Sequence, residues 1–183
     1  PGNVLSIAKT PELIDPIKEV LEQRGDGGTG FSRAWKMALW ARLLDGDRAN
    51  SIYKGYLQEQ CYLSLFAKCY TPLQVDGTLG VTAAISEMLV QSHEDVIQLL
   101  PALPKEWNSG KFYGVCTRGA FELNLEWENG VTKKVEILSK AGKKCKISAN
   151  NTIKVFLNGN QIQSKNGYIE FPTEKGQMYN LEY

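Results

Sequence analysis

The spacing of hydrophobic residues changes once along this chain of 183 residues, and the change divides the sequence into two parts. Over residues 1–100 the hydrophobic positions recur with the period of amphipathic helices, whereas over 111–183 they alternate with polar ones, as in half-buried strands. A proline-bracketed segment, LLPALPKEWNSGK at 99–111, joins the parts. We therefore predict an α+β protein with a helical domain at 1–100 and an antiparallel β domain at 101–183.

About four helices are predicted in the first part, at 11–23, 31–44 and 48–67, with the fourth beginning near Gly80. Thr10 and Pro11 suit the cap and first position of the first helix. The second helix is hydrophobic almost all round, which is typical of burial on several sides. We expect Gly46 to take a left-handed conformation after it and Asp47 to cap the third helix.

The second part predicts six to eight short antiparallel strands packed as a small sandwich. The segment AFELNLEW at 120–127 alternates hydrophobic and polar residues. Asn129-Gly130 follows directly, and an Asn-Gly pair between alternating runs is a strong hairpin signal. The pairs Asn158-Gly159 and Asn166-Gly167 repeat this signal further along.

Composition excludes several classes of function. The net charge of +1 gives no electrostatic reason to expect nucleic acid or a membrane surface as a partner, and no hydrophobic run approaches the roughly 20 residues of a membrane span. With one histidine and no Cys-x-x-Cys pair, we expect neither a metal site nor a cofactor. Two groups have simple expected roles: buried thiols for Cys61, Cys69, Cys116 and Cys145, and a solvated face for Lys133, Lys134, Lys143, Lys144 and Lys146.

Three features could carry chemistry. The loop GDGGTG at 25–30 lacks the lysine of a phosphate-binding loop, so it is either a corner feeding the next helix or a ligand-facing wall. Trp35 and Trp40 could pack in the core or stack on sugar rings. Asp76, in LQVDGTLG at 73–80, could accept backbone N–H groups near a helix start. Alternatively, its apolar flanks could hold the carboxylate in a partly dry setting suited to acid–base chemistry.

Three long blocks resemble one known family. They are TPELIDPIKEVLEQRGDGGTGFSRAWKMALWARLLDGDRA (10–49), LQVDGTLGVTAAISEMLVQSHEDVIQLLPALPKEW (73–107) and GVCTRGAFELNLEWENG (114–130). In order and spacing they are similar to the C-terminal part of the inverting α-L-fucosidases, glycoside hydrolase family 95. The resemblance implies the last part of an α/α toroid followed by a small β domain.

The resemblance also implies roles for individual residues. Asp76 matches the family aspartate that orients and polarises two asparagines in contact with the attacking water, on the base side of an inverting mechanism. Tyr70, Gln74 and Thr78 are the expected substrate-binding residues around it. Tyr70 stands where the family has a histidine, and Thr78 stands where it has an asparagine after Asp-Gly.

An inverting hydrolase also needs a general acid. The resemblance places the family's acid glutamate and asparagine pair in segments that precede this chain, and neither Glu59 nor Glu87 matches that acid. The chain begins with Pro1 rather than Met. We therefore expect a fragment or truncated relative of an α-L-fucosidase-like hydrolase that is inactive alone.

The expected partner is an oligosaccharide ending in L-fucose or L-galactose. Truncation would also leave an apolar helical face open to self-association. The alternative function is a non-catalytic carbohydrate-binding or protein-interaction module. Family habit implies a bacterial protein in the periplasm or outside the cell, although the first residues show no signal-peptide pattern.

Overall fold

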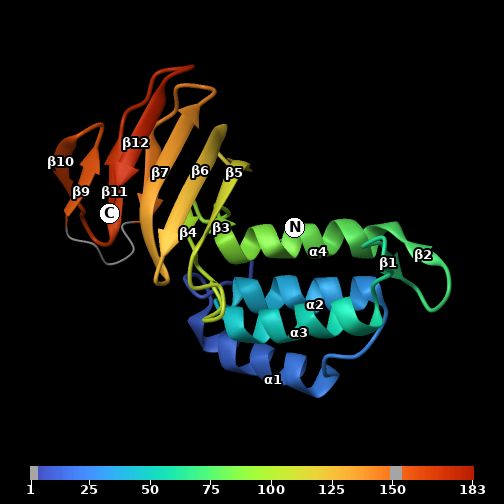
Figure 1. Cartoon of the computed structure of the whole chain (residues 1–183). Helices are drawn as coiled ribbons and strands as arrows, with labels where there is room; N and C mark the ends of the chain where they lie inside the picture. The colour runs from blue at the N-terminus through green and yellow to red at the C-terminus, as the bar shows by residue number, and fades with distance from the viewer. Residues whose placement is uncertain (1–3, 149–153) are drawn as a thin grey trace. The chain divides into compact units, whose positions relative to one another are not determined.

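A computed structural model describes residues 4–148 and 154–183 and confirms the α+β class, with helices first and antiparallel strands after them (Figure 1). The chain forms two compact units. The helical unit comprises residues 1–89 together with Pro101–Pro104, and the β unit comprises Val90–Leu100 together with Lys105–Tyr183.

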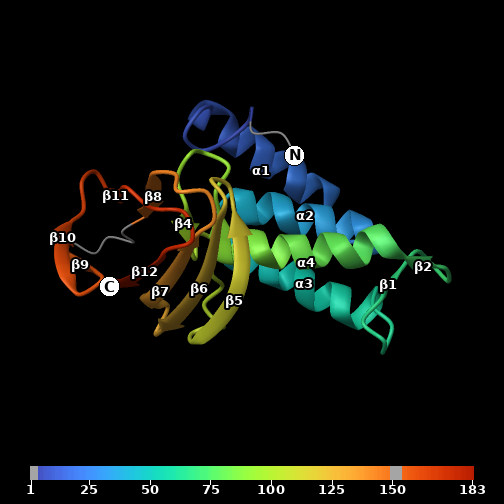
Figure 2. The same cartoon turned by 90° about the horizontal axis from the view of Figure 1, so that it is seen from above.

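The helical unit begins with a short 3-10 helix, η1 (Pro11–Leu13), which continues into α1 (Ile14–Arg24). Next come α2 (Gly30–Arg42) and α3 (Gly46–Glu59), and then a small hairpin of β1 (Ala67–Lys68) and β2 (Leu73–Gln74). The last helix, α4 (Val75–Leu89), packs with α3 against α2 (Figure 1 and Figure 2). Helix α2 is buried on several sides, as predicted, through Ala34, Met37, Trp40 and Ala41.

Several predicted helix ends were wrong. Thr10 makes no side-chain cap to the first helix, because its hydroxyl bonds with the backbone of Ser6 instead. The third helix stops at Glu59 rather than at 67, and the β1–β2 hairpin begins at Ala67, the last residue of the predicted range. The fourth helix starts at Val75, about one turn before the predicted Gly80.

The predicted turn between the second and third helices was also wrong. The left-handed residue is Leu44, with φ 60°, and the cap is Asp45, whose carboxylate accepts the Arg48 backbone N–H at 2.9 Å. Gly46 is the first residue of α3 and packs against the backbone of Ala102. Its missing side chain therefore serves a close approach rather than an unusual φ.

The β unit is built on a six-stranded antiparallel sheet in the order β10-β9-β12-β7-β6-β5. Its strands are β5 (Gly110–Thr117), β6 (Phe121–Glu128), β7 (Val131–Ser139), β9 (Lys154–Leu157), β10 (Asn160–Gln163) and β12 (Met178–Glu182). Two smaller pairs accompany it: β3 (Val90–Gln91) with β4 (Gln98–Leu99), and β8 (Cys145–Ser148) with β11 (Tyr168–Phe171).

The alternation seen in the sequence forms the core of the β unit. Phe121, Leu123, Leu125 and Trp127 on β6 are all buried. Asn129-Gly130 joins β6 to β7 and Asn158-Gly159 joins β9 to β10, as predicted. Each asparagine and glycine has a positive φ, which these tight turns require.

The thiols differ from the expected buried set. Cys61 and Cys69 are half-buried, Cys116 is exposed and Cys145 is buried, and all four are free. Burial raises the pKa of Cys145 to about 12, so it is a neutral thiol at physiological pH.

We expect a thiol-specific disulfide reagent to modify Cys116 in the folded protein and Cys145 only after denaturation, because the thiolate is the nucleophile. Peptide mapping by mass spectrometry would measure both sites, with Cys116→Ser as the control that removes the fast reaction. Equal rates at the two sites in the folded protein would contradict the burial of Cys145.

The described residues contain no helix long and apolar enough to cross a membrane. Within those same residues, no group of three or more His, Cys, Asp and Glu side chains is arranged to hold a metal ion.

Candidate active site at the start of α4

Asp76 lies in the first turn of α4, on the exposed surface. Its carboxylate accepts the backbone N–H of Gly77 at 2.9 Å. The drier of the two settings left open by the sequence is not found, because the neighbouring Val75 and Leu79 are 56% and 66% exposed and do not cover it. The carboxylate is therefore open to a ligand or to another segment of protein.

Two glycines bring the beginnings of α2 and α4 together behind Asp76. A Cβ on Gly77 would come within 2.8 Å of the Ala67 Cβ and 2.9 Å of the Phe31 backbone nitrogen. A Cβ on Gly30 would come within 2.7 Å of the same Ala67 atom. Only glycine fits such an approach. Two helix N-termini, each favouring negative charge, thus converge beside the aspartate.

Gln74 and Thr78, predicted to bind substrate, both make structural bonds at this junction. The Gln74 side-chain oxygen accepts the Phe31 backbone N–H at 3.0 Å and so satisfies a donor in the first turn of α2. The Thr78 hydroxyl accepts the Ala67 N–H at 2.9 Å and donates to the Gln74 carbonyl at 3.2 Å. These bonds fix the β1–β2 hairpin to both helices.

Replacing Gln74 with alanine is expected to lower the free energy of unfolding by about 1 kcal/mol, the usual cost of losing a helix cap. Gln74→Glu keeps an acceptor oxygen for Phe31 and should retain most of the stability. Urea denaturation followed by circular dichroism at 222 nm measures both variants. If Gln74→Glu is as unstable as Gln74→Ala, the bond to Phe31 is not what Gln74 contributes.

Tyr70 lies in the connection between β1 and β2, with φ 56° and 84% of its surface exposed. Its ring is thus available to solvent. The structure therefore places Gln74, Asp76 and Thr78 around one helix junction, with Tyr70 in the adjoining hairpin.

The two tryptophans of α2 differ in exposure, and only one of them packs in the core. Trp40 is 3% exposed and packs in the core, whereas Trp35 is 55% exposed and stacks on Phe31, with 6.3 Å between ring centroids. The Phe31 ring also lies close to Gly80 of α4. Sequence analysis missed Phe31–Trp35 as an exposed aromatic pair; the signal was their i, i+4 spacing.

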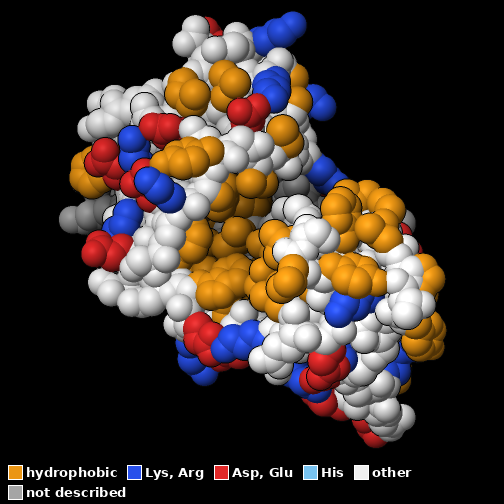
Figure 3. Space-filling model, turned by 45° about the vertical axis from the view of Figure 1, so that its right-hand side comes forward, with side chains coloured by type: hydrophobic (Ala, Val, Ile, Leu, Met, Phe, Trp, Pro, Cys, Tyr) orange, Lys and Arg blue, Asp and Glu red, His pale blue; other side chains and the backbone are white. Residues whose placement is uncertain are grey.

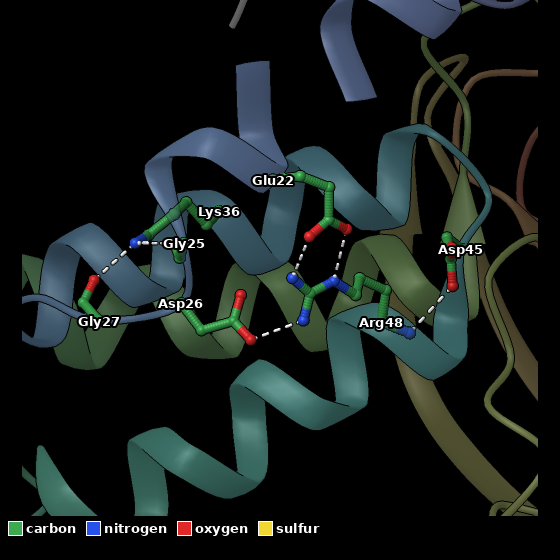
Figure 4. A network of polar contacts seen from close by, with 7 residues as sticks. All are labelled: Glu22, Gly25, Asp26, Gly27, Lys36, Asp45 and Arg48. Atoms are coloured by element: carbon green, nitrogen blue, oxygen red, sulfur yellow. Dashed lines mark hydrogen bonds and ion pairs between the residues drawn. The ribbon is translucent and has the colours of Figure 1, made fainter. Parts of the chain in front are cut away.

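The glycine loop at 25–30 is a braced corner that leads into α2 (Figure 4). Lys36 donates to the carbonyl oxygens of Gly25 at 2.6 Å and Gly27 at 2.5 Å, and burial lowers the pKa of its ammonium group. Arg48 bonds with both Glu22 oxygens at 2.8 and 3.0 Å and with Asp26 at 2.6 Å. This network ties α1, the corner and α3 together, and it favours the corner over a ligand-facing wall.

The carboxylates of Glu59 and Glu87 are both ion-paired with arginines. Glu59 pairs with Arg33, and Glu87 forms a bidentate pair with Arg42 at 2.6 and 2.9 Å. Each carboxylate would have to leave its arginine before it could reach a leaving-group oxygen.

Two family models together match almost the whole chain. The glycoside hydrolase family 95 catalytic domain matches residues 1–89, and the C-terminal domain of the same family matches residues 91–181.

Similar proteins include alpha-L-fucosidase 2 of Arabidopsis thaliana, which is 36% identical over 71% of this chain and 17% of its own length. Probable alpha-fucosidase A of Aspergillus niger is 27% identical over 70% of this chain and 19% of its own. The corresponding protein of Aspergillus oryzae is 28% identical over 69% and 21%.

Among solved structures, a GH127 beta-L-arabinofuranosidase from Geobacillus stearothermophilus covers 80% of this chain and 30% of its own, with a TM-score of 0.36 and 12% identity. The chain thus spans about a fifth of the length of its curated relatives. On the evidence of the two family models and the Arabidopsis relative, the chain belongs to glycoside hydrolase family 95, the family of α-fucosidase-like hydrolases, and corresponds to its C-terminal portion.

Proposed function

We propose that this chain is the C-terminal portion of a longer inverting α-L-fucosidase-like hydrolase, to which it contributes Asp76 on the base side of the reaction. The observation that carries the proposal is the match of 1–89 to the family's catalytic domain, with Asp76 exposed where α2 and α4 converge. The substrate of the longer protein is an oligosaccharide ending in α-linked L-fucose or L-galactose.

Inverting hydrolysis divides the chemistry between two sides of the scissile bond. One carboxylic acid protonates the leaving oxygen, while the opposite side activates a water, with about 6.5–9.5 Å between the two carboxyl groups. Asp76 is a solvent-facing carboxylate, and its proposed part in the second role is to orient the groups that hold the water. Glu59 and Glu87 are ion-paired with arginines and neither matches the family's acid, so we expect the chain by itself to be inactive.

A hydrolysis assay tests this division of labour. The isolated chain should release no nitrophenol from 4-nitrophenyl α-L-fucoside or α-L-galactoside, whereas the longer protein that contains it should hydrolyse at least one of them. Hydrolysis by the purified chain, removed by Asp76→Asn, would overturn the claim that the acid lies outside this sequence.

A second candidate function, a protein-interaction module that binds a partner or a second copy, draws on the exposed hydrophobic residues of the helical unit (Figure 3). They include Val20, Trp35, Leu63, Leu65, Leu73 and Leu79, each at least 50% exposed. A contiguous patch of such exposed side chains marks a surface that another protein covers. Light scattering across a concentration series tests this candidate, and a monomer at all concentrations would count against self-association.

A further inference from the structure

We propose that the β unit carries a binding site for a doubly charged oxyanion, a sulfate or phosphate group either free or esterified to a sugar. The site is a cavity of about 180 Å³ beside the β5–β6 turn. It lies within one unit and does not depend on the proposed hydrolytic function. Its polar lining is Ser92, Asp95, Arg118, Lys143, Lys144 and Lys146.

Charge is concentrated in this lining. Four cations and one carboxylate give a local charge of +3, in a chain whose net charge is only +1. Lys144 already pairs with Glu170 at 2.7 Å, and Lys146 lies over the Tyr168 ring at 4.8 Å. Within 4–148 and 154–183, Arg118 and Lys143 have no carboxylate partner. These two cations therefore attract an anion without first breaking an ion pair.

Arg118 is the residue best placed to recognise an oxyanion. It lies in the β5–β6 turn, where its backbone N–H donates to the Ser92 hydroxyl at 3.0 Å and its guanidinium donates to the His93 carbonyl at 3.4 Å. The remaining guanidinium donors form a planar fork that suits sulfate and phosphate oxygens. Because the Ser92 hydroxyl accepts from Arg118, its own proton is left to donate.

Three segments that line the cavity are hydrogen-bonded to one another. The Ile97 N–H donates to the Lys146 carbonyl at 2.9 Å, and the Ser148 N–H donates to the Ile97 carbonyl at 2.8 Å. These bonds join the β3–β4 loop to β8, while Arg118 joins the same loop to the β5–β6 turn. The charged groups are thus carried on a framework held in place by backbone bonds.

The cavity volume selects for a small group. Drug-sized ligands occupy pockets of roughly 300–1,000 Å³, so a cavity of about 180 Å³ fits one oxyanion with its water rather than several sugar rings. Asp95 is the one carboxylate among the described residues of the lining and is exposed, so it offsets part of the positive charge. The lysines expected to form a plain solvated face therefore divide: Lys143, Lys144 and Lys146 line this cavity, whereas Lys133 and Lys134 do not.

The test is a titration of the isotope-labelled chain with sodium sulfate and sodium phosphate, followed by amide shifts in NMR spectra at constant ionic strength. We expect saturable shifts confined to the cavity lining, Ser92, Arg118, Gly119, Lys143 and Lys144 among them. Arg118→Gln and Lys143→Gln should each weaken binding about tenfold. Lys133→Gln, which removes an equal charge outside the cavity, should leave binding unchanged.

The spectra also show whether each variant is folded, so lost binding and lost structure are distinguishable. Arg118 also bonds within the β5–β6 turn, so its replacement could disturb that turn. Lys143 provides the second variant because its side chain is exposed and lies outside the turn. A sulfated monosaccharide, its unsulfated parent and inorganic sulfate together distinguish a sugar-borne group from a free anion. Tighter binding of the sulfated sugar than of inorganic sulfate, with no binding of the parent, identifies a sugar-borne group. Non-saturating shifts, or equal weakening by Lys133→Gln, would overturn the site.

Discussion

Replacing Asp76 with asparagine in the longer hydrolase is expected to lower kcat for fucoside hydrolysis by about 10²–10⁴-fold, the usual cost of losing a group in general acid–base catalysis. An amide carries no negative charge and cannot polarise the groups that hold the attacking water. Stability should change by less than about 1 kcal/mol, because the exposed side chain only accepts the Gly77 N–H, which an asparagine oxygen also accepts.

Asp15→Asn is the matched control for this variant. Asp15 is also an exposed aspartate in the first turn of a helix of the same unit. Both substitutions remove a negative charge from a helix N-terminus, at a similar cost of a few tenths of a kcal/mol to 1 kcal/mol. The control should retain wild-type kcat. An equal loss of activity in both variants would show that the effect of Asp76 is structural.

Replacing Gly46 with alanine is expected to destabilise the helical unit by about 1–3 kcal/mol, although alanine is the better helix former. An added Cβ would lie 2.2 Å from the Ala102 carbonyl oxygen and 2.7 Å from the Leu103 carbonyl carbon. Ala102 is buried, and its N–H donates to the Met88 carbonyl at 3.1 Å. Because the opposing atoms are backbone, either α3 or the 101–104 segment must move.

Gly55→Ala is the control in the same helix, at an interior position where alanine is also the better helix former. Its Cβ would approach only the end of the Arg33 side chain, at 2.8 Å, which can shift more cheaply than backbone. Urea unfolding monitored at 222 nm compares the two variants. If Gly46→Ala is as stable as Gly55→Ala, the close packing of α3 on Ala102 is wrong.

Local patterns predicted the strands better than the helix ends. The β6–β7 hairpin depends on alternation and on Asn129-Gly130, both of which are visible within about 20 residues of sequence. The β1–β2 hairpin depends instead on Thr78 and on packing of Ala67 between Gly30 and Gly77. Contacts between residues so far apart leave no periodic signal, so the third helix was predicted to run up to Ala67, although it ends at Glu59.

In the candidate site at the start of α4, local sequence likewise identified some features and missed those that depend on distant contacts. Asp76 was identified through resemblance to a family motif, and its catalytic role stays a prediction. The partly buried setting considered for it is not found, because hydrophobic neighbours in sequence do not ensure burial, as the exposed Val75 and Leu79 show. The capping role of Gln74 toward Phe31, 43 residues away, required the folded chain.

The central claim is that this chain supplies the base side of an inverting hydrolase, and the most direct test is the anomer that the longer protein releases first. Proton NMR during hydrolysis of an α-L-fucoside distinguishes the two anomers of fucose before they equilibrate. The account predicts β-L-fucose as the first product, formed by the wild type and lost with Asp76→Asn. Release of α-L-fucose first would indicate a retaining mechanism and would contradict the role assigned to Asp76.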